Sequence, residues 1–524
     1  MGYLVLRDED LDQIRALGIT EEHVMSQIEL FKKGGSYLTL VRPCTIGDGI
    51  QRIPESEFER LIGHHQEAAD TGRLMKFVPA SGAASRMFKV LLWFKNSDQE
   101  IDRNHIAAKA DEGDTKFKDI LSFMDGIKDF AFFDDLKSVM ARDGLDTDRL
   151  VDEGRFTEIL EYLLTSKGLN YASLPKGLIR FHRYPNGNRT AFEEHLVEAA
   201  NYVKDRRGMC RLHFTVRPEH LKEFKRLLEK VGPRYEKEYN VRFQVDFSLQ
   251  KRSTDTIAVD LEDKPFRLED GTLLFRPGGH GALIENLNDL KGDVLYIKNI
   301  DNVVPDRLKD PTFLWKRILG GYLLELQKRI FGYLERITGE GAGKELIEES
   351  LSFAKKNLHI EPPEGQKLES EKEKLDFLLS RLNRPLRVCG MVKNVGEPGG
   401  GPFWVMGEDG ALSLQIVESA QVDPESEEQQ SILSSATHFN PVDIVCGVRD
   451  YRGNHFDLRR YVDTDAVFIS RKTKDGRDLK ALELPGLWNG AMADWITVFV
   501  EVPIITFNPV KTINDLLRDE HKNL

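Results

Sequence analysis

The chain has 524 residues, of which 40% are hydrophobic and 31% charged, and a net charge of −12, which predicts two to four domains around a large apolar core. The acidic balance argues against a nucleic-acid surface, and no apolar run approaches the roughly 20 residues of a membrane span. The four cysteines stand far apart without a C-x-x-C pair, so we expect neither disulfides nor zinc, and reduced thiols favour the cytoplasm.

Residues 1–73 are predicted to form a helical N-terminal region, because apolar residues recur three and four positions apart among Glu, Gln and Arg. At Leu74 the pattern changes to a short strand that enters a loop of small residues, and Arg86 follows that loop. The loop consists of Ser81, Gly82, Ala83, Ala84 and Ser85. A strand that leads through small residues into a helix is how open α/β sheets present a phosphate site.

The rest of the chain predicts an α/β core with a helical insert. Residues 91–170 return to a charged helical pattern, and strands then alternate with helices up to residue 310. This alternation predicts a mostly parallel sheet, so we expect an α/β core to span 74–310 with 91–170 as the insert. Residues 311–384 are predicted to be helical, and the strand-rich residues 385–524 would complete the core.

The small-residue loop is the first candidate for chemistry. Without large side chains, the backbone N–H groups of such a loop can approach phosphate oxygens, and Arg86 could then grip a phosphate through two hydrogen bonds. No Gly-Lys-Ser/Thr follows, so a P-loop kinase or ATPase is excluded. Small residues after a strand are also common turn material, which is the alternative for this segment.

Three further motifs carry polar groups. Lys176 follows a proline at the head of a strand, where it could neutralise a transferring phosphate or be an ordinary solvated lysine. Glycines on both sides of His280 suggest close backbone approach to a ligand, although a plain turn has the same composition. Asp301 ends an apolar strand between two asparagines, which suits a divalent cation already chelated by phosphates, or a helix cap.

These motifs follow one another in the order found in the UDP-glucose pyrophosphorylases and their UDP-sugar relatives, which the chain resembles over roughly residues 74–518. Further similar segments are Val392-Lys393, Gly399-Gly400-Gly401, Leu414–Val422, Phe439-Asn440, Val502-Pro503, Phe507–Thr512 and Asp515-Leu516-Leu517. Each segment alone is a weak signal, whereas their shared order is a strong one.

The resemblance implies a fold and an activity. The fold would be that of the GT-A-like nucleotide-diphospho-sugar transferases, with a helical insertion and without a C-terminal β-helix, since seven residues follow Leu517. The enzyme would join a nucleoside triphosphate, with UTP favoured, to a sugar 1-phosphate and release pyrophosphate, using Mg²⁺. The resemblance implies that residues 74–310 bind the nucleotide and that residues 385–524 form the sugar-binding part. The substrates would be the partners of the enzyme, with no nucleic acid and no membrane involved.

The resemblance also implies roles for particular residues. The catalytic residues would be Arg86, Lys176, Lys393 and Lys511. The nucleotide or sugar would contact Ser81, Gly82, Ala83, Ala84, Ser85, Gln250, Gly278, Gly279, His280, Gly281, Asn299, Glu418 and Asn440. The metal ligands would be Asp301 and Asn489, although a buried turn is the alternative for Asn489. We expect Asp301 within reach of Gly82 and Lys176, and Lys511 beside the same phosphate.

Two departures from the family pattern leave other functions open. The first loop lacks the family's Gly-Gly pair, and 90 positions separate Arg86 from Lys176, which the family keeps nearly adjacent. One alternative is therefore a non-catalytic sugar-nucleotide binder, against which the retained lysines and Asp301 argue. The other is a glycosyltransferase that uses a nucleotide-sugar donor, which would not need the Pro-Lys and Pro-Val-Lys elements.

Overall fold

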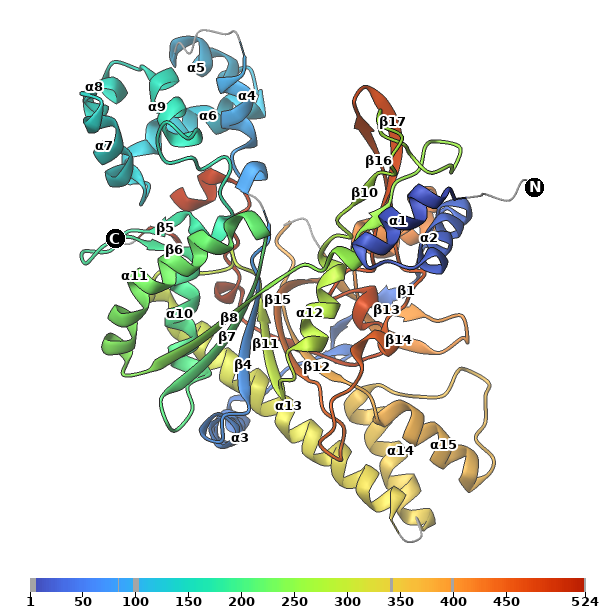
Figure 1. The fold of residues 1–524 in the computed structure, drawn as a ribbon. Helices are drawn as coiled ribbons and strands as arrows, with labels where there is room; N and C mark the ends of the chain where they lie inside the picture. Colours follow the sequence, from blue (N-terminus) through green and yellow to red (C-terminus); the bar gives the residue numbers. More distant parts are fainter. Residues whose placement is uncertain (1–5, 83, 98–102, 340–342, 397–399, 523–524) are drawn as a thin grey trace. The chain divides into compact units, whose positions relative to one another are not determined.

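The computed structural model describes residues 6–82, 84–97, 103–339, 343–396 and 400–522 (Figure 1). Two compact units share these residues, and each is made of three separate segments. Unit 1 comprises Met1–Phe77, Ser248–Ile297 and Lys316–Ile504, and unit 2 comprises Val78–Phe247, Lys298–Trp315 and Ile505–Leu524. Among the described residues, no helix combines the length and the apolar character that crossing a membrane requires.

Unit 1 carries most of the strands. They are β1 (Thr39–Pro43), β2 (Thr45–Ile46), β3 (Gly49–Gln51), β4 (Leu74–Pro79), β9 (Thr256–Ile257), β10 (Phe275–Arg276), β11 (Val294–Lys298), β12 (Leu386–Lys393), β13 (Gly401–Met406), β14 (Leu412–Val417), β15 (His438–Gly447), β16 (Phe468–Lys474), β17 (Arg477–Glu483) and β18 (Ile496–Glu501). The last residues of β4 and β11 belong to unit 2.

The large sheet of unit 1 follows the order β2-β3-β18-β12-β15-β11-β4. Strand β11 pairs in parallel with β4, and β12 pairs in parallel with β18 and antiparallel with β15. The side chains of β11 and β15 are buried throughout. Such unbroken burial belongs to strands with both faces covered, as in mostly parallel sheets. The predicted α/β class with a mostly parallel central sheet is therefore confirmed.

The helices of unit 1 include three that the sequence places between residues 311 and 384. All its helices are α1 (Asp8–Leu17), α2 (Glu21–Lys33), α3 (Phe58–Asp70), α12 (Leu283–Asp289), most of α13 (Lys309–Thr338), α14 (Lys344–Leu358), α15 (Glu371–Leu382) and α16 (Glu427–Ser434). Helices α1 and α2 pack through apolar residues such as Ile14 and Ile28 against Ile257 and Leu482, which lie on β9 and β17 (Figure 1).

The prediction that residues 1–73 form helices is wrong for residues 39–51, which form β1, β2 and β3. The sequence there is rich in strand and turn formers, with Val41 in β1, Pro43 at its end, and two glycines at φ of 85° and 90°, Gly47 and Gly49. Glycine adopts such positive φ without strain, so the chain turns tightly between β2 and β3. Helical periodicity on both sides hides this short strand pattern.

The large sheet continues beyond β4 with two strands of unit 2, in the order β4-β7-β8. The strands of this unit are β5 (Arg180–His182), β6 (Arg189–Thr190), β7 (Met209–Val216) and most of β8 (Arg242–Leu249), whose last two residues belong to unit 1. Its helices are α4 (Lys89–Lys95), α5 (Arg103–Asp111), α6 (Thr115–Gly126), α7 (Phe133–Arg142), α8 (Thr147–Asp152), α9 (Phe156–Leu164), α10 (Ala191–Tyr202) and α11 (Leu221–Tyr239).

The residues predicted as a helical insert, 91–170, form α4 to α9, which Figure 1 shows as a group apart from β7 and β8. Aromatic side chains hold this group together: the rings of Phe130 and Phe132 stack at a centroid distance of 4.8 Å, and Phe132 meets Tyr171 edge-on at 5.5 Å. The group therefore has an apolar core of its own, which is how 90 residues fit between Arg86 and Lys176.

Candidate functional site

The small-residue loop lies at the end of β4, where the last buried residue, Ala80, donates its N–H to Thr215 O of β7 at 2.9 Å. Gly82 and Ser85 are exposed, and Arg86 closes a short 3-10 turn with its side chain exposed. A Cβ added at Gly82 would meet no described atom within 4 Å. Packing within the described part of the chain therefore does not require glycine at position 82, which leaves room for a ligand.

Both sides of this loop are tied to other predicted motifs of unit 2. Ala84 N–H donates to Leu174 O at 3.0 Å, and Met87 O accepts from Ile513 N–H at 3.2 Å. The loop thus meets the Pro-Lys motif and the late Pro-Val-Lys motif, as the phosphate-site hypothesis requires. The predicted residue Ala83 lies outside the described residues.

Lys176 begins a 3-10 turn, Lys176–Leu178, directly after Pro175. A Cβ added at Gly177 would lie 2.9 Å from the ring of Phe224 and 3.4 Å from Ile300, so glycine lets the turn pack closely against its neighbours. This packing turns the Lys176 side chain toward Asp301: Nζ lies 2.6 Å from Asp301 Oδ2 and donates to Val510 O at 2.7 Å. The predicted meeting of Lys176 and Asp301 is therefore confirmed.

Asp301 follows β11 in a turn whose geometry depends on its neighbours. Asn302 N–H donates to Asn299 O at 3.3 Å, which closes the turn. The Asn302 side chain is buried, accepts from Asn508 N–H at 2.9 Å and donates to Thr506 O at 3.4 Å. Asn302 was not among the predicted site residues, yet its amide joins the Asp301 turn to the C-terminal segment.

Lys511 lies on that C-terminal segment. Val510 N–H donates to Asp301 O at 3.2 Å, so the backbone of Lys511 lies one residue from the Lys176–Asp301 pair. The N–H groups of Lys511 and Thr512 both donate to Asp515 Oδ2, at 2.8 and 2.7 Å. The Lys511 residue is half-buried. We call residues 81, 82 and 84–86, together with Lys176, Asp301 and Lys511, the charged cluster.

The charged cluster fits a Mg²⁺ ion that arrives with its substrate. The described residues contain no group of three His, Cys, Asp or Glu side chains that could hold a metal alone. Mg²⁺ commonly binds through one or two carboxylates together with substrate phosphates. The Asp301 side chain is 17% exposed, and Lys176 Nζ lies against its Oδ2 at 2.6 Å.

The predicted glycine motif lies in unit 1 and is packed tightly. Gly278 O accepts from Leu484 N–H at 2.9 Å. Gly279 has a φ of 77°, and a Cβ on Gly281 would lie 2.0 Å from Pro485 O. The His280 residue is half-buried within this turn. The glycines are therefore required by the fit of the 278–281 turn against residues 484–485.

The His280 ring stacks on Trp488, with centroids 4.6 Å apart and planes 21° from parallel. Its Nδ1 accepts from Leu487 N–H at 3.0 Å. Burial lowers the pKa of His280 to about 4, so the imidazole is neutral at physiological pH. Since Nδ1 accepts, the hydrogen of the neutral ring lies on Nε2.

Glu418 follows β14 and extends this group. Burial raises its pKa, a hydrogen bond from the Trp488 indole opposes that rise, and the nearby charge of Glu483 adds to it. We call His280, Trp488 and Glu418 with the 278–281 turn the His280–Trp488 cluster. Trp488 and Glu483 were not among the predicted site residues. The one signal that could have pointed to Trp488 is an aromatic residue in a Gly-rich turn.

Asn489 was predicted as a second metal ligand, but its side chain is buried in the turn that also contains Trp488. It is 1% exposed, and its Nδ2 donates to Ile416 O at 2.8 Å. A side chain with that burial and that partner has no access to a metal bound on substrate phosphates. The position fits the buried turn that was the alternative for this residue.

The remaining predicted residues are spread over unit 1. Lys393 ends β12 and is exposed opposite His438, and Gln250 is half-buried after β8. Asn440 is buried in β15, where its Oδ1 accepts from Val442 N–H at 3.1 Å. Among the described residues, no hydrogen bond or ion pair links Lys393, Gln250 or Asn440 to His280.

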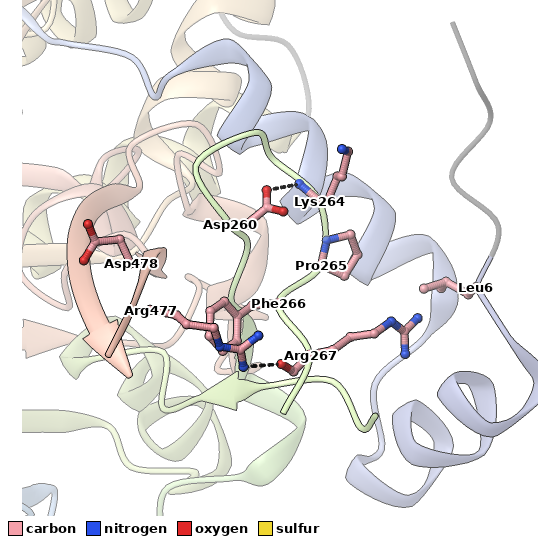
Figure 2. Close-up of a pocket in the computed structure, with 8 residues that line it drawn as sticks. All are labelled: Leu6, Asp260, Lys264, Pro265, Phe266, Arg267, Arg477 and Asp478. Atoms are coloured by element: carbon pink, nitrogen blue, oxygen red, sulfur yellow. Dashed lines mark hydrogen bonds between the residues drawn. The ribbon is translucent and has the colours of Figure 1, made fainter. Parts of the chain in front are cut away.

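A cavity of about 460 Å³ lies elsewhere in unit 1, between the β16–β17 hairpin and residues 260–267 (Figure 2). Arg477 stacks over the ring of Phe266 at 4.3 Å and donates to Arg267 O at 2.6 Å. Arg267 in turn pairs with Asp10 through both carboxylate oxygens. None of the predicted site residues lines this cavity, and its cations are held by the protein itself.

Comparison with known proteins gives a family and a set of related structures. Residues 7–522 match the model of a family described as a domain of unknown function, DUF4301. No curated protein matches the chain.

The solved structures similar to this chain include UDP-glucose phosphorylase from Trypanosoma brucei, at 14% identity and a TM-score of 0.45 over 97% of this chain and 77% of that one. The uridine diphosphate N-acetylglucosamine pyrophosphorylase of the same organism is 11% identical, with a TM-score of 0.46 over 98% and 79%. UDP-glucose pyrophosphorylase from Leishmania major is 12% identical, with a TM-score of 0.42 over 98% and 79%. They belong to the class that the motifs resemble, but at these scores the activity has to be argued from the chain's own residues.

Proposed function

This chain belongs to the DUF4301 family, and we propose that it is a nucleotidyltransferase that joins a nucleoside triphosphate to a sugar 1-phosphate and releases pyrophosphate. The resemblance of the sequence motifs favours UTP as the nucleotide and a UDP-sugar as the product. Within the α/β class, we propose the GT-A-like arrangement of the nucleotide-diphospho-sugar transferases.

The observation that carries this proposal is the contact of Lys176 with Asp301 and Val510. Three motifs that are far apart in the sequence meet there, within 2.6 to 2.7 Å of one ammonium group. A fourth, the loop of residues 81–86, is hydrogen-bonded beside them. Packing of the fold does not need a half-buried lysine, an acid and a small-residue loop at one place. Transfer of a nucleotidyl group to a sugar phosphate needs such groups, because they neutralise the charge of the phosphates.

The chemistry needs positioning and charge neutralisation more than it needs a nucleophilic side chain. A phosphate oxygen of the sugar phosphate attacks the α-phosphorus in line, the new P–O bond forms as the α–β bond breaks, and the electron pair leaves with pyrophosphate. We assign Lys176 to the charge that develops on the α-phosphate. Arg86 and the backbone of the small-residue loop are assigned to the leaving pyrophosphate.

Lys511 is assigned to the α-phosphate of the joined product, since its backbone adjoins Val510 beside Asp301. Asp301 would hold Mg²⁺, which would supply positive charge against the repulsion between two anionic substrates. In the absence of substrate, the ion pair with Asp301 holds the Lys176 ammonium at the site. The His280–Trp488 cluster of unit 1 presents rings and a half-buried acid, which suit contact with an uncharged ring such as a base or a sugar.

The test uses the full chain with Mg²⁺, each nucleoside triphosphate in turn, and a panel of sugar 1-phosphates. We expect pyrophosphate and a sugar nucleotide in equal amounts from at least one pair. A UDP-sugar that raises the melting temperature without any turnover would make the chain a non-catalytic binder. Cleavage of a UDP-sugar to UDP, with no use of added pyrophosphate, would make it a glycosyltransferase.

A further inference from the structure

Unit 2 contains a fully buried histidine beside the charged cluster that has no part in the predicted chemistry. His195 of α10 is 0% exposed, and its ring meets Phe214 of β7 edge-on, with centroids 6.4 Å apart. Its Nε2 lies 3.1 Å from the backbone oxygen of Ile300. A carbonyl oxygen only accepts, so the hydrogen of this bond lies on Nε2. The imidazole therefore donates to the residue that precedes Asp301.

This hydrogen bond holds one of the two peptide groups that flank the Cα of Asp301. The Ile300 carbonyl and the Asp301 N–H belong to one planar peptide group, so a partner that holds the oxygen also holds the plane. The Asp301 carbonyl belongs to the next peptide group and accepts from Val510 N–H at 3.2 Å. Because both planes are held, the φ and ψ of Asp301 are fixed, and with them the direction in which its carboxylate leaves the backbone.

An ion pair next to His195 ties α10 to the same stretch of chain. Lys298, the last residue of β11, places its Nζ 2.8 Å from Glu198 Oε1, and the two side chains are 1% and 0% exposed. Glu198 Oε2 lies 4.0 Å from His195 Nδ1. Breaking a buried ion pair is costly, because one charge would remain without its partner. Helix α10 therefore holds the chain at Lys298 and again at Ile300, just before Asp301.

The proposed chemistry requires a carboxylate whose place is fixed. Asp301 lies 2.6 Å from Lys176 Nζ, and a carboxylate that also binds Mg²⁺ has to meet near-ideal octahedral geometry. A misplacement of about 1 Å in a reacting group can cost roughly 100-fold in rate. A turn whose peptide planes could rotate would move this carboxylate by such a distance.

We infer that His195 is a positioning residue for the Asp301 carboxylate. It acts through the peptide group of Ile300 and touches no substrate, while the pair of Glu198 with Lys298 keeps α10 in place beside it. The inference rests on the proposed function, because the phosphates and their Mg²⁺ are what require a fixed carboxylate.

The experiment measures the affinity of the full chain for inorganic pyrophosphate with Mg²⁺ by calorimetry, in a double-mutant cycle. His195→Leu keeps much of the volume and removes the donor, so we expect about ten-fold weaker binding. Asp301→Ala should still bind, because Arg86 and Lys176 remain. In that background His195→Leu should change the affinity by less than about two-fold, since the imidazole acts only through the missing carboxylate.

Two further variants separate the hydrogen bond from the burial of a ring. In His195→Gln the amide nitrogen stands as many bonds from the Cα as Nε2 does, so we expect an affinity within about three-fold of the wild type. His213→Leu is the matched control: His213 is 7% exposed in β7 and lies next to Phe214, so its side chain points to the opposite face of the strand. It should bind pyrophosphate as the wild type does.

The outcomes distinguish this inference from the proposed function. Wild-type affinity in His195→Leu, an equal loss with and without Asp301, or no recovery in His195→Gln would each overturn the positioning role and leave the proposed function intact. A wild type that binds no pyrophosphate would overturn both. If His195→Leu does not fold, His195→Asn replaces it, because its shorter amide stays polar but does not reach Ile300 O. If Asp301→Ala abolishes binding, the recovery in His195→Gln decides.

Discussion

The two candidate clusters are built by opposite means. In unit 2 the charged cluster is joined by side-chain charges, with Lys176 Nζ lying between Asp301 Oδ2 and Val510 O at 2.6 and 2.7 Å. In unit 1 the His280–Trp488 cluster is held by close backbone fit, with Gly281 packed so that a Cβ would lie 2.0 Å from Pro485 O. The charged cluster should keep its backbone conformation when a charged side chain is removed. In the His280–Trp488 cluster, an added methyl group at Gly281 would force the backbone to move.

This difference matches two kinds of ligand contact. Phosphates need cations that can shift slightly as charge develops, and lysine is a compact and mobile point charge. A base or sugar needs a rigid surface, which a stacked His–Trp pair at 4.6 Å provides. Substitutions should therefore separate the clusters: loss of charge should reduce turnover in unit 2, and added volume should reduce stability in unit 1.

Lys176→Ala should have the largest effect. It removes the cation assigned to the α-phosphate and leaves Asp301, 17% exposed, without its partner. We expect turnover to fall about 1,000-fold, roughly 4 kcal/mol of transition-state stabilisation. Pyrophosphate release measures the loss, and the thermal midpoint should change little. Lys225→Ala, at an exposed lysine of α11, is the control. Equal turnover in the two variants would remove Lys176 from the mechanism.

Lys511→Ala should come next, with turnover lowered about 100-fold, roughly 2.7 kcal/mol. Its backbone is fixed by Asp515 and does not depend on the side chain, so folding should be almost unchanged. Lys511→Arg should restore little, because a planar guanidinium does not replace a point charge. Full activity in Lys511→Ala would show that the segment serves only to shape the Asp301 turn.

The site in unit 2 was the part that the sequence predicted best. The order of the motifs led to the expectation that Lys176 and Asp301 meet, although 125 residues separate them, and they do. Order along the chain is informative here because strand ends of one α/β sheet collect at one edge. The strands that end near residues 80 and 298 were likewise visible as mostly apolar runs, although Lys76 interrupts the first and Lys298 ends the second.

Other features left only weak signals in the sequence. Short strands such as β1 and β3 depend on partners far along the chain: β1 pairs with β13 and β3 with β18. The stack of His280 on Trp488 joins residues 208 positions apart. A single aromatic residue in a turn does not allow its contact partner to be predicted from the sequence. His195 and Ile300 likewise fit an ordinary helix and an ordinary turn, and only the fold brings them together.

Gly281→Ala tests the unit 1 side of the comparison. The added Cβ would overlap the backbone oxygen of Pro485, which cannot rotate away as a side chain can. We expect a loss of about 2 kcal/mol in the free energy of unfolding, as for other overpacked sites. Urea unfolding measures it. Gly63→Ala in α3 is the control, since its Cβ would meet no described atom within 4 Å and alanine favours helices. Equal stability of the two variants would contradict the tight fit.

The smallest effect concerns His280, for which we expect no change of ligand affinity with pH. Burial lowers the pKa of His280 from 6.5 to about 4, so its ring should stay neutral from pH 5.5 to 8. The affinity for UDP-glucose, whose phosphates carry a constant charge in this range, should then be flat if His280 contacts it. A step in affinity near pH 6.5 that disappears in His280→Asn would show an ordinary exposed histidine. That result would contradict the rigid stack with Trp488.

Stability should behave differently from affinity over the same range. The folded pKa of His280 is depressed, so between about pH 4 and 6.5 the unfolded chain binds more protons than the folded one. The free energy of unfolding should therefore fall as the pH drops through this window. His182 and His521 contribute in the same direction, so the term of His280 is the difference in slope between the wild type and His280→Asn. Identical slopes would mean that His280 titrates alike in both states, which its burial against Trp488 does not allow.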